Sequence, residues 1–207
     1  MTWIERWRYT RGELQGRARR TRAPTLSPLT PAEIVLHLRL APGSETGPEK
    51  ELLDRLQAAM VGHLERYASI AVMDQEWRLT LNCWPPPGIA LELPYPPLVE
   101  ITDISMPDPG FDPADFLITA SDVLPGILYP AEGHFWPGGA GRQDIAIALR
   151  CGYEDPKDVP PSIKQALLTA IATGYENRES LSQYNLTPIL ELGWENLIMP
   201  YREAGFA

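Results

Sequence analysis

The placement of proline is the strongest constraint on the fold of this chain. There are 22 prolines in 207 residues, about twice the usual share of roughly 5%. They follow neither a collagen period nor a PxxP spacing, and they are densest between positions 85 and 97. Because proline cannot donate a hydrogen bond to a strand ladder, this stretch cannot hold long central strands. The sequence therefore predicts many short elements joined by rigid turns.

Apolar residues at helical spacing predict four helices. The first, over 30–40, opens with Thr30, Pro31 and Glu33, in which Thr30 caps the helix and Glu33 reaches back to the cap amide. The second covers 48–69, where apolar residues repeat every three or four positions. The third covers 159–178 and the fourth covers 188–199, and we expect Pro200 to end the fourth.

Between the second and third helices, the apolar period changes from about 3.6 to 2. Trp77, Leu79 and Leu81 alternate with polar residues, and further short apolar stretches lie at 89–93, 99–105, 116–119, 126–129 and 145–151. The expected fold class is α+β: a four-helix bundle with a small antiparallel β insertion, over about 75–151, between its second and third helices. Residues 30–207 would form a single domain, preceded by an extended basic N-terminal arm over 1–29.

Charge is distributed unevenly along the chain. The net charge is −9, but residues 1–22 hold seven arginines and two glutamates, a net of +5, which leaves −14 for the remainder. Arginine and tryptophan are typical anchors of interfaces, and a basic arm suits nucleic acid or an acidic protein. A disordered, solubilising tail is the alternative interpretation. We expect partner binding by Trp3, Trp7, Arg17, Arg19, Arg20 and Arg22.

Several classes of protein are disfavoured by the sequence. No apolar run approaches the roughly 18 residues that span a bilayer, and residues 1–6 lack the apolar core of a signal peptide. We therefore expect a cytoplasmic protein. Cys83 and Cys151 lie far apart in the sequence without a CxxC motif, so we expect reduced thiols rather than a disulfide.

Candidate catalytic chemistry is sparse. His37, His63 and His134 are isolated, without the spacing of zinc ligands, and no metal is predicted. Glu132, His134 and Trp136 lie in one loop, which is compatible with a small enzyme or ligand site, but aromatic anchoring of a turn is the preferred interpretation. The glycine-rich stretch 138–142 lacks the lysine and the following helix of a phosphate-binding loop.

Short strings between positions 30 and 203 form a recognisable series. They are QEWRLTL at 75–81, WP at 84–85, LPYPPLV at 93–99, YP at 129–130, WP at 136–137, CGY at 151–153, VPPSIKQA at 159–166, YENRE at 175–179 and PYR at 200–202. With the order helix, helix, strands, helix, helix, this series resembles the head-tail connector (adaptor) proteins of tailed phages. Two departures are the basic residues 1–22, which lie outside the pattern, and residues 67–72, where the family often has a glycine-containing turn.

The resemblance implies a structural protein without catalysis and without a cofactor. Such proteins form a ring, usually of twelve copies, between the portal protein and the stopper or tail protein, around a channel through which DNA passes without sequence-specific binding. An acidic body suits that channel because it repels phosphate. The expected location is the bacterial host cytoplasm during assembly, and then the head-tail interface of a phage, prophage or gene transfer agent particle.

The resemblance also implies contact residues. The family's C-terminal segment typically docks on the portal, which corresponds here to Trp194, Tyr201, Arg202 and Phe206. Together with the arginines and tryptophans of the arm, these are the residues we expect to bind the portal or capsid. The polar stretch 175–179 is either a solvated helix end or a contact between subunits through Tyr175, Asn177 and Arg178.

Two other functions remain open at the level of sequence. One is a small enzyme or ligand-binding domain with its site around Glu132, His134 and Trp136. The other is nucleic-acid binding by the basic arm as the main activity, which would depend on the arginines at 17–22 and weaken with salt.

Overall fold

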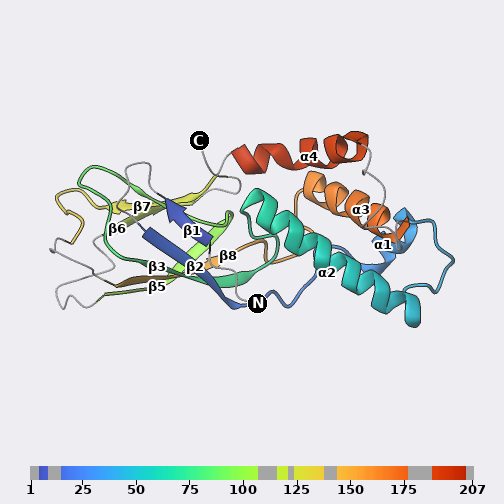
Figure 1. Cartoon of the computed structure of the whole chain (residues 1–207). Helices are drawn as coiled ribbons and strands as arrows, with labels where there is room; N and C mark the ends of the chain where they lie inside the picture. Colours follow the sequence, from blue (N-terminus) through green and yellow to red (C-terminus); the bar gives the residue numbers. More distant parts are fainter. Residues whose placement is uncertain are drawn as a thin grey trace. The chain divides into compact units, whose positions relative to one another are not determined.

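The structure is a computed structural model that describes residues 5–8, 15–106, 116–120, 124–137, 144–176 and 188–203. The chain divides into two compact units (Figure 1). Residues 1–25 and 74–152 form the first, which we call the β unit. Residues 26–73 and 153–207 form the second, the helical unit. Each unit therefore combines segments that are distant in the sequence.

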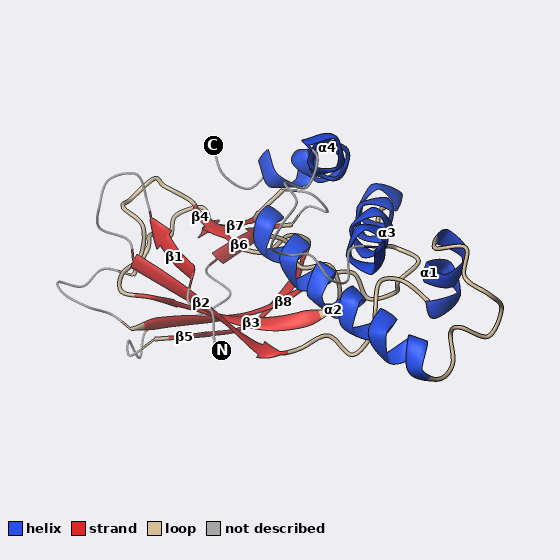
Figure 2. Cartoon of the chain, turned by 45° about the vertical axis from the view of Figure 1, so that its right-hand side comes forward, coloured by secondary structure: helices blue, strands red, loops and turns tan. Residues whose placement is uncertain are grey.

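The β unit holds two antiparallel sheets (Figure 2). The larger sheet has five strands in the order β1-β2-β3-β8-β5, with bounds Glu5–Arg8, Gln15–Arg22, Gln75–Leu81, Ile145–Cys151 and Leu98–Ser105. The smaller sheet has the order β4-β7-β6, with bounds Leu91–Leu93, Gly126–Pro130 and Phe116–Thr119. The strands after Gln75 coincide with the six short stretches that the period of two predicts.

Apolar side chains from both sheets are buried in the β unit. They alternate along the strands with exposed residues and include Leu79, Leu81, Leu91, Leu93, Leu128, Ile145, Ile147 and Leu149. One close approach requires glycine: a Cβ at Gly126 of β7 would lie 2.4 Å from Cδ2 of Leu98 in β5. The start of β7 thus packs directly on the start of β5.

The expected fold class is wrong in two respects. Strands form two sheets of a separate unit rather than a small insertion in a four-helix bundle, and the N-terminal segment is not an extended arm. Gly16 and Ala18 of β2 are buried, whereas Arg17 and Arg19 are exposed, so the segment alternates like a half-buried strand. It pairs with β3 in antiparallel register, Ala18 opposite Leu79. The density of arginine conceals this alternation in the sequence.

The helical unit contains α1 (Pro31–His37), α2 (Pro48–Ala68), α3 (Pro161–Glu176) and α4 (Pro188–Glu203), and α3 packs against both α2 and α4. The capping box is confirmed: the Thr30 hydroxyl accepts from the Glu33 amide, and the Glu33 carboxylate accepts from the Thr30 amide. The core is apolar and includes Ile34, Leu53, Leu64, Ile163, Ala166, Leu167, Ile171 and Ile198.

Helix α2 ends without glycine. Ser69 adopts a left-handed conformation (φ 54°, ψ 40°), a position that usually favours glycine. The amides of Ser69 and Ile70 both donate to the carbonyl of Glu65, and the buried Glu65 carboxylate accepts from the Val72 amide at 3.0 Å. One glutamate thus binds the backbone on both sides of the turn and fixes the chain as it leaves the helix.

Helix α4 continues beyond the expected end at Met199. Pro200 lies inside the helix, which runs to Glu203. A proline there removes one backbone hydrogen bond, but the last turn is held by side chains. The hydroxyls of Tyr201 and Ser162 are hydrogen-bonded at 2.8 Å, and Arg202 Nη1 donates to the hydroxyl of Tyr67 at 3.1 Å. Among the described residues, no helix is long and apolar enough to cross a membrane.

Candidate assembly surfaces

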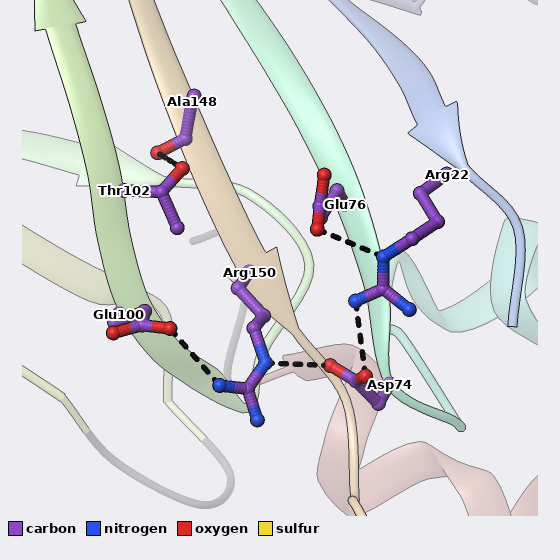
Figure 3. A network of polar contacts seen from close by, with 7 residues as sticks. All are labelled: Arg22, Asp74, Glu76, Glu100, Thr102, Ala148 and Arg150. Carbon is purple, nitrogen blue, oxygen red and sulfur yellow. Dashed lines mark hydrogen bonds and ion pairs between the residues drawn. The ribbon is translucent and has the colours of Figure 1, made fainter.

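A polar network crosses the larger sheet at one end (Figure 3). Arg22 of β2 donates to Glu76 at 2.8 Å and to Asp74 at 3.0 Å, and Arg150 of β8 donates to Asp74 and to Glu100 of β5, each at 2.9 Å. Asp74 therefore joins the two arginines. The network ties β2, β3, β8 and β5 together through residues that are 50 to 76 positions apart in the sequence.

The network shifts the acid–base equilibria of its members. Burial alone would raise the pKa of Asp74, but hydrogen bonds from Arg150 and Arg22 lower it below its usual value. Hydrogen bonds to Glu76 and Asp74 raise the pKa of Arg22. Arginine is charged at any ordinary pH, so the network loses charge only when one of its carboxylates is protonated. Nearby, burial and then the charge of Asp74 raise the pKa of Cys151 to about 12, which keeps this thiol protonated and unreactive.

Three other arginines gather on the same open face of the sheet. Arg17 and Arg19 of β2 and Arg78 of β3 are exposed, and Arg19 lies directly opposite Arg78 in the register. Residues directly opposite in an antiparallel pair share a face. In the part of the chain that the structure describes, no carboxylate pairs with any of the three. This group, which we call the arginine face, carries unneutralised positive charge.

The four arginines of the N-terminal segment that were predicted to bind a partner thus divide into different roles. Arg22 is an internal ion-pair residue with a side chain 36% exposed. Arg20 donates to Gln75 Oε1 at 3.0 Å and lies 5.6 Å above the ring of Trp77, which stacks on Tyr95. Arg17 and Arg19 remain available for external contacts. Trp7 occupies β1, opposite Gly16 in the register, and Trp3 lies outside the described residues.

On the helical unit, the structure brings two of the predicted C-terminal residues together. The Trp194 ring packs against His63 at 5.3 Å and Tyr67 at 4.9 Å between centroids, and the Arg202 guanidinium lies 4.8 Å from the Tyr67 centroid. His63 and Tyr67 are four positions apart on α2, which places them on one face. The predicted Tyr201 binds Ser162 instead. Phe206 lies outside the described residues.

Of the predicted subunit contacts, one can be located. Tyr175 of α3 donates its hydroxyl hydrogen bond to the Glu49 carboxylate of α2. This residue therefore links two helices of the same unit. Asn177 and Arg178 lie outside the described residues.

The loop considered as an enzyme or ligand site is built around a structural tryptophan. Trp136 is buried, donates from Nε1 to the carbonyl of Ile89 at 2.8 Å, and stacks on Trp84 and Phe116. Glu132 and His134 are exposed. Among the described residues, no group of three or more His, Cys, Asp or Glu side chains could hold a metal ion. The geometry supports aromatic anchoring of a turn.

Sequence reasoning did not identify several residues of these surfaces. Asp74, Glu76, Glu100 and Arg150 form the network, but they are brought together only by strand pairing. Arg78 was detectable in principle, because it alternates with Trp77 and Leu79 and so belongs on the solvent side of its strand. Its position opposite Arg19 depends on β2, whose strand character was not expected.

Comparisons with known proteins identify structures of similar fold. No protein-family model and no curated protein match the chain. Among solved structures, a chain of the virion of a native gene transfer agent (GTA) particle is 22% identical, with a TM-score of 0.71 over 89% of this chain and 94% of that one. A chain of the neck of an empty GTA particle, computed with C6 symmetry, is 23% identical, with a TM-score of 0.72 over the same shares.

A third structure, the neck of a native GTA particle computed with C12 symmetry, contains a chain 20% identical with a TM-score of 0.60, over 88% of this chain and 94% of that chain. At these identities, the similarity shows a common fold. It extends over nearly the whole of both chains and therefore includes both the β unit and the helical unit.

Proposed function

We propose that this chain is a structural component of the neck of a phage-like particle, an adaptor that forms a ring between the portal protein and the stopper or tail protein. The observation that carries the proposal is the fold shared with GTA neck and virion chains over 89% of this chain. The order of short strings in the sequence supports the same family independently of the fold. On this proposal the chain has no catalytic activity and needs no cofactor.

The proposed ring surrounds a channel for DNA. The acidic composition suits this role, since residues 23–207 carry a net charge of −14. A surface of this sign repels phosphate, so DNA passes without being held. The C12 symmetry of the similar GTA neck supports a ring of twelve copies. The chain would be made in the host cytoplasm and end in the particle at the head-tail interface.

We further propose that the C-terminal half of α4 contacts the portal. Met199 is a large apolar side chain in this half of the helix, and it is 49% exposed, so it is available to an apolar contact on a partner. The contacts of Trp194, Tyr201 and Arg202 within the helical unit hold the helix in place, so that its exposed residues are presented in a fixed geometry. Pre-organisation of this kind reduces the entropy cost of binding.

The experiment that tests the function is electron microscopy of particles made with and without this chain, together with co-purification of the tagged full-length chain and the portal protein of the same particle. We expect a ring of density below the portal that contains the chain, and DNA-filled heads without tails when the chain is absent. Normal tailed particles that lack the chain would contradict the proposal.

A matched pair of variants tests the contact of α4. Met199→Asp should abolish co-purification with the portal, because it places a charge on the proposed apolar contact. Leu36→Asp is the control, since Leu36 of α1 is 80% exposed and lies away from α4 in the sequence. Equal loss of portal binding by both variants would show that α4 is not the contact.

A further inference from the structure

The arginine face lies on β2 and β3, inside the edge strand β1, and the strand at the opposite edge, β5, is acidic. In the register, Arg19 of β2 is opposite Arg78 of β3, Arg78 is opposite Ala148 of β8, and Ala148 is opposite Asp103 of β5. One row of residues therefore runs across the sheet from two arginines to an aspartate, with a small alanine between them. Asp103 is exposed, and no cation in the described part of the chain pairs with it.

The isolated chain gives no reason for this arrangement. Like charges directly opposite each other in an antiparallel pair are destabilising, and Arg19 and Arg78 lie in that relation. On the same face, by contrast, Arg22 and Arg150 are both paired with carboxylates. Arg17, Arg19 and Arg78 have no such counter-charge among the residues that the structure describes.

We propose that the arginine face of one copy of this chain binds the acidic β5 side of the next copy, head to tail, around the ring. The inference rests on the proposed function, since it assumes a ring. A closed ring with a single type of contact needs two different, complementary patches on each copy. The two sides of this sheet have that property, and charge complementarity favours their contact.

The chemistry favours a second copy over nucleic acid. A neighbouring copy brings the exposed carboxylate of Asp103, which no cation of the described residues pairs with. DNA would have to approach a chain whose remaining residues carry −14, which opposes its binding. Two register shifts interrupt β5, after Leu98 and after Ile101. An irregular edge of this kind disfavours main-chain pairing with another strand, so the contact is made by side chains.

A charge-swap experiment on the full-length chain tests the inference. Arg19→Glu places a carboxylate within the arginine face, opposite the proposed Asp103 of the next copy, and Asp103→Arg places a cation opposite the proposed Arg19. Each single variant should reduce ring formation, measured by sedimentation velocity and electron microscopy in the presence of the portal, by at least tenfold. The double variant Arg19→Glu/Asp103→Arg should restore rings to within about twofold, because the complementary charges are exchanged. Ring formation should also recover in an equimolar mixture of the two single variants, because copies of the two variants can alternate around the ring.

Charge-matched controls are Arg55→Glu and Glu51→Arg, both at exposed positions of α2, and they should assemble as the unaltered chain does. Arg19→Glu replaces a repulsive pair by an attractive one, so its loss of assembly cannot be attributed to a weakened fold; circular dichroism and thermal melting verify this. Rings should also be lost at high salt, which screens exposed charges.

Three results would overturn the inference. Normal rings from both single variants would leave the proposed function intact and remove only this contact. Failure of the double variant to recover, with both single variants defective and folded, would show that the two positions do not meet. Normal assembly of Arg19→Glu with loss of binding to duplex DNA would assign the face to nucleic acid. If the unaltered chain forms no ring with the portal, the proposed function fails and the inference fails with it.

Discussion

The two units of the chain use polar side chains in different ways. In the helical unit, the capping box joins residues three positions apart, and the contact that closes the end of α2 joins Glu65 to Val72. In the β unit, Arg22 and Arg150 form ion pairs with residues 50 to 76 positions away. The start of α1 and the end of α2 can therefore be stabilised as soon as their own residues are present. The sheet is complete only when three distant segments have met, and the end of α4 likewise depends on the distant Ser162 and Tyr67.

The largest loss of stability is expected when a buried leucine in the core of each unit is replaced by alanine, and this change tests the contrast between the units. Leu79 of β3 and Leu167 of α3 are both fully buried, and replacement of either by alanine should cost about 2–5 kcal/mol. Hydrogen exchange should show lost protection in β2, β3 and β8 for Leu79→Ala, and in α2, α3 and α4 for Leu167→Ala. Equal loss in both units from either variant would show that the units unfold as one.

A smaller effect is expected from loss of the capping box. Thr30→Ala removes the acceptor for the Glu33 amide and should destabilise the helical unit by about 1 kcal/mol. A double-mutant cycle with Glu33→Ala, measured by urea denaturation, isolates the coupling of the two side chains. A coupling near zero would show that the reciprocal hydrogen bonds do not stabilise the helix.

Arg22→Gln should destabilise the β unit by about 1 kcal/mol or less, because its two ion pairs are partly exposed to water. Arg17→Gln, on the same strand but without an ion-pair partner among the described residues, is the matched control and should change stability by less than about 0.5 kcal/mol. Urea denaturation compares them. Equal effects would mean that Arg22 contributes through the strand, not through the network.

The smallest effect concerns pH. The pKa of Asp74 is lowered in the folded chain, so its contribution to stability is present above the unfolded value of about 3.9 and is lost as pH falls through the lower folded value. Asp74→Asn should therefore make the stability of the β unit less dependent on pH below about 4. The pKa of Glu33 is also lowered, and the acid sensitivity of the helical unit should remain. Unchanged acid sensitivity of the β unit would assign it to another carboxylate.

Most of the secondary structure could be predicted because its signals are local. Proline and capping residues marked the starts of helices, as at Thr30 and Pro48. The period of two marked the strands after Gln75. Strand β2 was missed because its partner lies more than 50 positions later, and without that partner its alternation of small residues and arginines is indistinguishable from a solvated arm.

The candidate surfaces were less predictable than the elements. Arg17 and Arg19 were identified from composition, but their separation from Arg20 and Arg22 depends on side-chain partners that only the register reveals. The end of α4 was misplaced because Pro200 is a strong local signal that tertiary contacts of Tyr201 and Arg202 override.

The distance between β2 and β3 in the sequence has a consequence during synthesis. At about 5–20 residues per second, the ribosome delivers Gln75 several seconds after Arg22, so β2 emerges long before the strand that covers it. A strand whose backbone edge stays unpaired for that time invites aggregation. The arginines of β2 make nascent chains repel one another and keep this segment soluble until β3 has been synthesised. The side chains that we propose for assembly thus act first as protection for an unfinished sheet.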